Sequence, residues 1–218
     1  MQRVIAVLIL IIILALVIVY FLPSTIHLEK SMILKARSEV VFDQINHPNA
    51  WRKWAAWIKE DPMINLTEHG PVSSEGAALE WSSKVPEIGA GNMIIRSSQP
   101  PTRVQATVNF NDMAPSENVF VLANTGNGAG ITWTIDMNLA DKGFPAGWIN
   151  KIKGLSWKNT LSDWMEKSLK NLDNSTADII YTPDPSINDT LINRIDSLNR
   201  KVDSLKRIST EKDTVFLP

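Results

Sequence analysis

The sequence predicts an α+β fold class: a curved antiparallel β-sheet wrapped on a long C-terminal helix, preceded by one transmembrane helix and followed by a short helical tail. Three observations predict it. Short runs rich in β-branched and aromatic residues alternate between apolar and polar positions through the middle of the chain. An amphipathic stretch at 156–172 comes after them, with its apolar residues at helical spacing. Near the start, residues 4–22 carry no charge.

Composition narrows the possible partners and chemistry. The chain has 218 residues, and its 22 basic and 23 acidic side chains give a formal net charge of −1. Because nucleic-acid binding requires a basic face, we expect no nucleic-acid partner. The chain contains no cysteine, which excludes disulfides, thiolate nucleophiles and thiolate metal sites.

The uncharged run at 4–22 has the length of a membrane span. As a helix its 19 residues would extend about 28 Å, close to the roughly 30 Å hydrocarbon core of a bilayer. A cleaved signal peptide is the alternative, but its apolar region is usually about 7–15 residues long and ends at a small-residue cleavage site. No such site is present here, where the next residue is Pro23. We therefore expect residues 1–23 to be a single-pass transmembrane anchor.

The charges beside this run allow two orientations. Only Arg3 and the amino terminus precede it. Three basic residues lie soon after it: Lys30, Lys35 and Arg37. Counted alone, these charges favour a cytoplasmic domain. A run so near the amino terminus also resembles a signal anchor that exports the remainder of its chain, and we expect this second arrangement, with the soluble domain on the extracytoplasmic side.

The first part of the soluble domain is predicted to be a strand, a helix and a tryptophan-rich segment. Residues 26–36 alternate in the manner of a strand. Ser38 is a suitable N-cap for a short helix directly after this strand. Trp51, Trp54 and Trp57 then recur every three residues and share one side of a helical turn or two. These indoles either close the end of a cavity or belong to the core.

From residue 65 onward the pattern changes to that of a β-meander. Five further runs are predicted strands: 78–82, 92–97, 103–110, 118–124 and 130–139. Two of them have clean apolar sets on one face: Val104, Ala106, Val108 and Phe110, and Ile131, Trp133, Ile135, Met137 and Leu139. Their alternate residues are polar, so we expect one face of the sheet to be solvated and the other to be covered by the helix at 156–172.

Four segments in this order carry a resemblance to a known family. They are SEVVFDQINHPNAWRKWAAW at 38–57, GAGNMII at 89–95, GAGITWTIDMNL at 128–139, and the helix containing DWMEKSLKNL. Together they resemble the SRPBCC (START-like, helix-grip) superfamily, and most closely its small membrane-anchored polyketide cyclase/dehydrase-like branch, over residues 24–173 and the anchor. The resemblance implies a helix-grip fold, in which a sheet of about six or seven strands grips the C-terminal helix around a cavity for an apolar or amphipathic small molecule. It implies no particular reaction.

Such a cavity would be lined by inward strand residues and by the apolar stripe of the helix. The candidates for ligand binding are Trp57, Trp81, Met93, Ile95, Val108, Phe110, Trp133, Ile135, Trp164 and Met165. The alternative is a filled core in which these side chains contact one another. Four polar groups could orient a guest: Glu80, Arg96, Thr107 and Asp136. Alternation places Thr107 and Asp136 on the solvated face.

No catalytic or metal-binding pattern emerges. His27, His47 and His69 are scattered over different predicted elements without ligand spacing. Glu60 and Asp61 are neighbours at the end of the tryptophan segment, which suits a charged helix end better than an acid–base pair. We therefore predict no catalytic residue, no metal and no cofactor.

Beyond the domain, the sequence predicts a linker at 174–186, a helix at 187–210 and a disordered end at 211–218. The helix has an apolar seam at heptad spacing: Leu191, Ile195, Leu198, Val202 and Leu205. Three heptads are marginal for a coiled coil, so homo-oligomerisation and a lone amphipathic helix remain alternatives.

Three functions are compatible with these features. The first is a membrane-anchored binding module that holds a hydrophobic or lipid-like small molecule in a helix-grip cavity, with its membrane contact through residues 4–22. The second is a polyketide cyclase/dehydrase-like enzyme acting in the same cavity, which a buried carboxylate or histidine would favour. The third is an assembly protein that uses the anchor and a coiled-coil tail. We favour the first, and expect binding without catalysis.

Overall fold

The computed structural model describes residues 2–110, 113–141 and 143–179, together with 194, 197, 198 and 200–202. The chain divides into two units, 1–179 and 180–218. In the second unit, the described residues of the predicted helix at 187–210 are helical. The rest of that helix, residues 180–186 of the predicted linker and the end at 211–218 lie outside the described residues.

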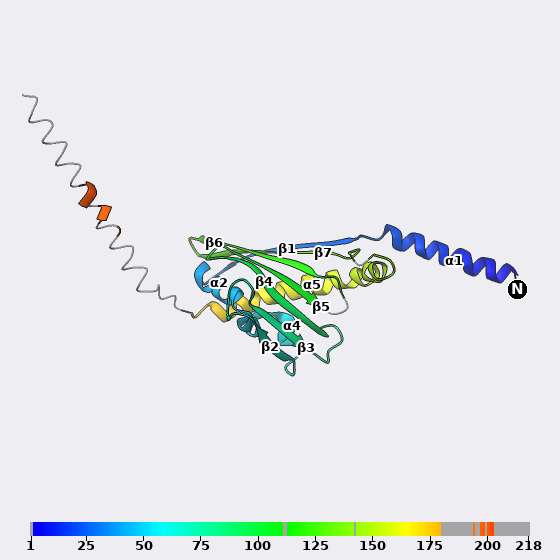
Figure 1. Cartoon of the computed structure of the whole chain (residues 1–218), viewed down its shortest axis with the longest axis horizontal. Coiled ribbons are helices and arrows are strands. Elements are labelled where there is room, and N and C mark those ends of the chain that lie inside the picture. Colours follow the sequence, from blue (N-terminus) through cyan, green and yellow to red (C-terminus); the bar gives the residue numbers. More distant parts are fainter. Residues whose placement is uncertain are drawn as a thin grey trace, which may run out of the picture. The chain divides into compact units, whose positions relative to one another are not determined.

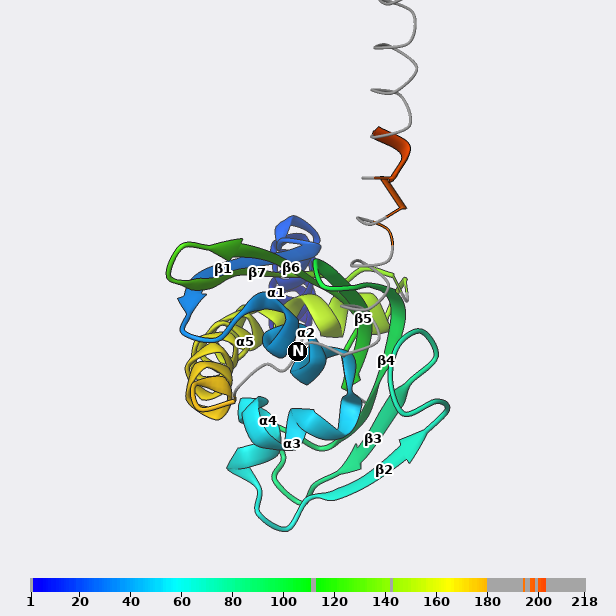
Figure 2. The ribbon, with the colours of Figure 1, turned by 90° about the vertical axis from the view of Figure 1, so that its left-hand side faces the viewer.

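The first unit contains a seven-stranded, fully antiparallel sheet in the order β1-β7-β6-β5-β4-β3-β2. Its strands are β1 (Thr25–Leu34), β2 (Asn65–His69), β3 (Ala78–Ser82), β4 (Ala90–Gln99), β5 (Arg103–Phe110), β6 (Ser116–Thr125) and β7 (Gly128–Asn138). The predicted α+β class is confirmed, and β2 is an additional edge strand whose residues are mostly exposed. Figure 2 shows the strands forming an arc around the helices.

The helices inside this arc are α2 (Ser38–Asn46), the single turn η1 (Pro48–Ala50), α3 (Trp51–Trp54), α4 (Ala56–Glu60) and the long α5 (Ala146–Thr176). The apolar residues of β5 and β7 that alternation assigned to one face are all buried. Thr107 was expected to be solvated on the opposite face, but it is only 6% exposed. Its hydroxyl accepts a hydrogen bond from Arg96 Nε and donates one to Glu117, and these long side chains cover it.

The predicted N-cap at Ser38 is wrong. The N-cap of α2 is Arg37, in an extended conformation, and Ser38 is the first helical residue. The Ser38 backbone N–H donates to Asn124 Oδ1 at the end of β6, at 3.1 Å. A side chain from another strand therefore satisfies a free N–H of this helix, which a local capping residue would otherwise do.

Helix α5 begins ten residues before the amphipathic stretch at 156–172, at Ala146. Its first turns pack closely because Gly147 and Gly154 face the segment just after β7. A Cβ at Gly147 would crowd Ala140, and one at Gly154 would overlap Leu139. Glycine is a poor helix former, so residues 146–155 lack the sequence pattern that predicted a helix at 156–172.

Polar contacts fix α5 against the short helices. The Ser168 hydroxyl accepts the Ala56 N–H at 2.8 Å, at the start of α4. Asn171 donates to the Trp54 carbonyl, and Asp173 accepts the Lys35 N–H at 2.8 Å. Because these partners lie on three different segments, the bonds fix both the position of α5 along the sheet and its rotation about its own axis.

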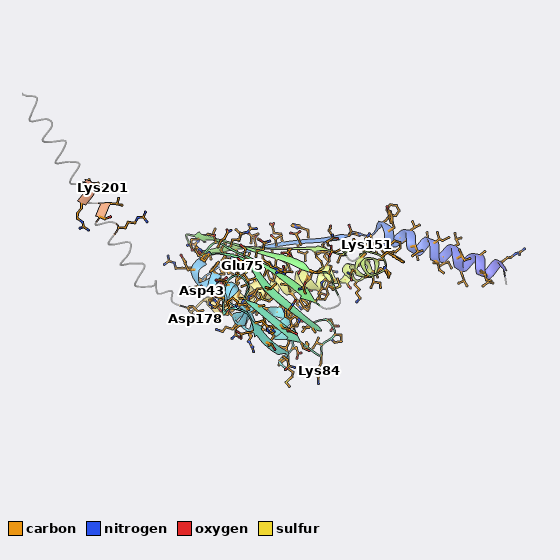
Figure 3. The ribbon with its side chains drawn as sticks, in the orientation of Figure 1. Asp43, Glu75, Lys84, Lys151, Asp178 and Lys201 are labelled. Carbon is orange, nitrogen blue, oxygen red and sulfur yellow. The ribbon has the colours of Figure 1, made fainter. Side chains whose placement is uncertain are left out.

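Helix α1 (Gln2–Phe21) precedes β1. Over Arg3–Phe21 it is long and apolar enough to cross a membrane, and none of that span is buried in the protein. A signal sequence would meet the same criteria of length and composition. The last turn of α1 lies beside the first turns of α5, where Lys151 Nζ donates to the Tyr20 carbonyl at 3.2 Å. Figures 1 and 3 show α1 leaving the domain at the end that carries Lys151.

Candidate functional site

The space between α5 and the sheet is almost filled. Seven of the predicted cavity residues line it, but the volume left between them is only about 10 Å³. They are Trp57, Val108, Phe110, Trp133, Ile135, Trp164 and Met165. The other three, Trp81, Met93 and Ile95, are buried without lining that space. A volume of this size holds about one water molecule.

Aromatic rings fill the region where a guest was expected. The ring of Phe110 stacks on Trp164 with centroids 5.7 Å apart, and it meets Trp81 edge-on at 5.1 Å and Trp157 at 5.2 Å. Trp57 contacts Phe110 at 6.0 Å. We call Trp57, Trp81, Phe110, Trp157 and Trp164 the pocket cluster. Phe110 is its centre, because each of the four indoles packs against it.

A larger pocket of about 560 Å³ adjoins this cluster beside residues 153–160 of α5. One wall is the loop between β3 and β4, and the other is the first half of α5. Its lining residues are Pro86, Glu87, Ile88, Gly89, Ala90, Phe110, Met113, Lys153, Ser156, Trp157 and Thr160. We call it the end pocket. Its volume lies within the range of about 300–1,000 Å³ that is usual for small-molecule sites.

Phe110 lines both the end pocket and the small central space. It is therefore the side chain that separates them. Among the ten predicted site residues it is the one that lines the end pocket. Sequence reasoning missed the others because most of them lie in loops or at strand ends, and those within the amphipathic stretch at 156–172, Ser156, Trp157 and Thr160, were not among the candidates for a cavity beneath the helix. The glycine at 91 was the available hint, since it marks a place where backbone and ring approach closely.

That approach is visible at Gly91. A Cβ there would overlap both the Asn109 carbonyl and the ring of Trp81. Glycine at this position of β4 lets the Trp81 ring lie in direct contact with the strand backbone. A larger residue at position 91 would therefore displace Trp81 from the pocket cluster.

Three indole N–H groups in the pocket cluster lack an acceptor. The Nε1 atoms of Trp57, Trp81 and Trp157 are shielded from solvent and have no hydrogen-bond partner among the described residues. Trp164 differs, because its Nε1 donates to Glu60 Oε2 at 2.9 Å. An unpaired buried donor is unfavourable by about 1–3 kcal/mol. The cluster therefore holds hydrogen-bonding capacity that the described protein groups leave unused.

Charged groups beside the cluster fix α4 to α5 and to residues 83–89, the loop between β3 and β4 that we call the pocket loop. Glu60 also accepts from Lys167 Nζ at 3.0 Å, and this carboxylate raises the pKa of the lysine. Asp61 accepts hydrogen bonds from the Ser83 hydroxyl and the Met63 N–H. These bonds, that from Ser83 foremost, lower the pKa of the Asp61 carboxyl. Ser83 begins the loop that walls the end pocket.

The described lining of both spaces offers little acid–base chemistry. Glu87 is the one carboxylate among these lining residues, and it is exposed. The polar groups of the central space, Ser116 and Asn118, are buried and bonded to each other, and Asn118 Oδ1 accepts the Trp133 N–H at 3.0 Å. Each is therefore already committed to a protein partner.

The histidines and the other polar candidates lie elsewhere. His27 pairs with Asp136 at 2.6 Å and His69 with Glu80 at 3.2 Å, all four side chains being exposed, while His47 Nδ1 bonds the Asp43 carbonyl oxygen. Within the part of the chain that the structure describes, no three His, Asp or Glu side chains gather in a way that could hold a metal ion.

Comparison with known proteins places the fold. No protein-family model matches the chain, and no curated protein matches it. Solved structures do. A protein of unknown function from Staphylococcus aureus matches 68% of this chain and 91% of its own, at 11% identity and a TM-score of 0.51. A protein from Rhodobacter sphaeroides matches 70% of this chain and 93% of its own, at 14% identity and a TM-score of 0.51.

A third match is the di-domain ARO/CYC StfQ from the steffimycin biosynthetic pathway. It covers 70% of this chain but only 50% of that protein, at 12% identity and a TM-score of 0.50. At such identities the likeness concerns the fold alone. The seven-stranded sheet around α5 is accordingly an SRPBCC-like helix-grip fold.

Proposed function

We propose that this protein is a membrane-anchored binding module for a hydrophobic or lipid-like small molecule that carries hydrogen-bond acceptors. The molecule is held in the end pocket and against the pocket cluster. Helix α1 is the anchor, and the domain lies on the extracytoplasmic side of the membrane. The helix-grip fold supports the proposal, because proteins of this fold typically bind hydrophobic ligands between sheet and helix.

The single observation that carries the proposal is the group of unpartnered indole donors beside a pocket of ligand size. Trp57, Trp81 and Trp157 surround Phe110 with apolar area, and their N–H groups need acceptors. A guest with a carbonyl, ester or ether oxygen supplies those acceptors, while its apolar body covers the rings. A purely hydrocarbon guest would leave the donors unpaired.

Phe110 controls how deep the guest reaches. The central space of about 10 Å³ admits no organic molecule, so a guest first occupies the end pocket, against Trp157. It reaches Trp57 and Trp81 only when the Phe110 ring turns aside. The Phe110 ring turns about its two side-chain torsions, and because four indoles pack against it, those rings shift as well.

The enzyme alternative has less support from the described residues. A cyclase or dehydrase acting by acid–base catalysis needs a buried acid or base at its substrate, whereas Glu87 is exposed at the pocket. The assembly alternative depends on the tail at 187–210, most of which lies outside the described residues.

The proposal is tested with two matched probes, 2-acetylnaphthalene and 2-ethylnaphthalene, which differ by a carbonyl in place of a methylene. Binding to the full chain in lipid nanodiscs is followed by tryptophan fluorescence, with empty nanodiscs correcting for partition into lipid. We expect the ketone to bind about 3- to 10-fold more tightly, the equivalent of one hydrogen bond. Equal affinities would contradict the role of the indole donors.

A blocking variant locates the site. Ser156→Trp fills the end pocket, whereas Asn159→Trp places the same bulk on an exposed position of α5 that does not line it. We expect the first variant to abolish probe binding and the second to leave it unchanged. Binding that survives Ser156→Trp would place the ligand elsewhere.

The anchor is tested separately by intact mass: a mature chain that begins after residue 22 would show a cleaved signal sequence.

A further inference from the structure

The outward face of α5 changes character along the helix. In the first half its side chains are apolar: Ile149, Ile152 and Leu155 are 51%, 52% and 56% exposed. Further along the same face, the exposed residues are polar or charged and include Asn159, Asp163, Glu166 and Lys170. Gly147, Asn150 and Gly154 occupy the opposite, buried face. The apolar residues are therefore not part of the core, and some other surface covers them or they stay in water.

The start of the helix adds two aromatic rings to this surface. Phe144 is 74% exposed, and its ring lies edge-on against that of Trp148 with centroids 5.3 Å apart. Residues 146–160 also contain three lysines and no acidic residue. Aromatic and aliphatic side chains with nearby lysines are typical of helices that lie in the interfacial region of a bilayer.

The position of this surface relative to α1 identifies what covers it. Lys151 bonds the carbonyl of Tyr20 in the last turn of α1, so the apolar half of α5 is the half beside the end of the apolar span. Three residues separate Phe21 from the start of β1 at Thr25, a tether of at most about 14 Å. With α1 in the bilayer, this end of the domain stays within that distance of the lipid headgroups.

We infer that the apolar half of α5, with Phe144 and Trp148, lies in the lipid headgroup region and docks the domain on the membrane. This inference rests on the proposed anchoring by α1. Lys151 and Lys153 contact anionic headgroups from the edges of this surface. Because Lys153 and Ser156 also line the end pocket, the pocket opens beside the bilayer, and a lipid-like guest enters it without crossing bulk water.

Spin labels at single cysteines test this placement, since the chain contains no cysteine of its own. Ile152→Cys labels the apolar half, and Leu155→Cys repeats the measurement one turn later. Asp163→Cys is the matched control: it lies on the same face three turns on, about 16 Å along the axis. The full chain is reconstituted in vesicles of phosphatidylcholine and phosphatidylglycerol. Label accessibility to oxygen, which partitions into lipid, is compared with accessibility to a water-soluble nickel chelate.

We expect labels at 152 and 155 to be several-fold more accessible to oxygen than to nickel, and the label at 163 to show the reverse. A nickel-accessible label at 152 and 155 overturns the docking. Labels protected from both reagents, with dipolar broadening between copies, also overturn it, because a second chain would then cover the surface. Leu10→Cys separates this failure from that of the anchor: if it reports the bilayer interior while 152 reports water, the anchor stands and the docking does not.

Discussion

Two tryptophan-rich clusters in this domain differ in whether their indole N–H groups have hydrogen-bond acceptors. In the closed cluster, formed by Trp51, Trp54, Phe120 and Trp133, every indole N–H has an acceptor. Trp51 and Trp54 donate to the carbonyls of Ile45 and Gln44, and Trp133 donates to Asn118. In the pocket cluster three of the four indoles have no acceptor among the described residues. Both clusters are well packed, so burial alone does not distinguish a core from a site. The hydrogen bonds do.

The largest expected effect compares the two phenylalanines. Phe110→Ala and Phe120→Ala each remove a buried ring, and we expect each to lower the free energy of unfolding by about 3–5 kcal/mol. Urea unfolding of the full chain in mild detergent micelles measures the loss. Adding 2-acetylnaphthalene should restore stability to Phe110→Ala only, because that cavity joins the end pocket to the unpartnered donors. Equal rescue of both variants would remove the distinction between the clusters.

The second prediction isolates the hydrogen bond. Trp133→Phe and Trp81→Phe delete the same ring volume from buried positions. The first leaves Asn118 Oδ1 without its donor, whereas the second removes a donor that has no partner in the part of the chain that the structure describes. We therefore expect Trp133→Phe to be more destabilising than Trp81→Phe by about 1–3 kcal/mol, as measured by urea unfolding. If the two losses are equal, a partner such as a bound water already satisfies Trp81.

How much of this contrast the sequence could predict depends on the type of signal. Alternation in β5 and β7 predicted the inward residues, since a strand has a strict period of two. It could not predict whether those residues enclose a void, because that depends on how four indoles and Phe110 fit together in space. For this reason the sequence predicted a central cavity where the structure leaves a space of only about 10 Å³.

The end pocket and the docking surface escaped prediction for a different reason. The pocket lies between a loop and the side of α5, and it has no period in the sequence. The first half of α5 directs Ile149, Ile152 and Leu155 outward and Gly147 and Gly154 inward, the reverse of the pattern expected for a helix packed on a sheet in water. A helix that meets lipid on its outer face has no need of a polar one.

The third prediction concerns ligand discrimination. Trp157 is the unpartnered indole that lines the end pocket, so Trp157→Phe should reduce the preference for 2-acetylnaphthalene over 2-ethylnaphthalene from about 3- to 10-fold toward equality. Trp164→Phe is the matched control within the same cluster, because its N–H is already bound to Glu60. Fluorescence titration in nanodiscs gives both ratios. A preference that persists in Trp157→Phe would assign the hydrogen bond to a different donor.

The smallest expected effect is a pH dependence of the stability that Asp61 contributes by holding the start of the pocket loop. Asp61 holds Ser83 at the start of this loop, and the Ser83 hydroxyl, followed by the Met63 N–H, lowers the pKa of the Asp61 carboxyl in the folded protein. Its stabilising contribution is complete above the unfolded-state pKa of about 3.9 and is lost as the pH falls through the lower folded-state value. The excess stability of the wild type over Asp61→Asn should therefore decline on acidification.

Urea unfolding of both proteins at neutral pH and at pH values below about 4 measures that excess, and taking the difference cancels the other carboxylates, Glu166 among them, whose pKa is also lowered. A difference that stays constant over this range would mean that Asp61 is not held as a carboxylate by Ser83. Probe binding is measured at the same pH values. If acidification weakens binding to the wild type but not to Asp61→Asn, the pocket loop is coupled to the pocket cluster. The closed cluster would not explain that result, because among the described contacts none of its groups bonds Asp61 or Ser83.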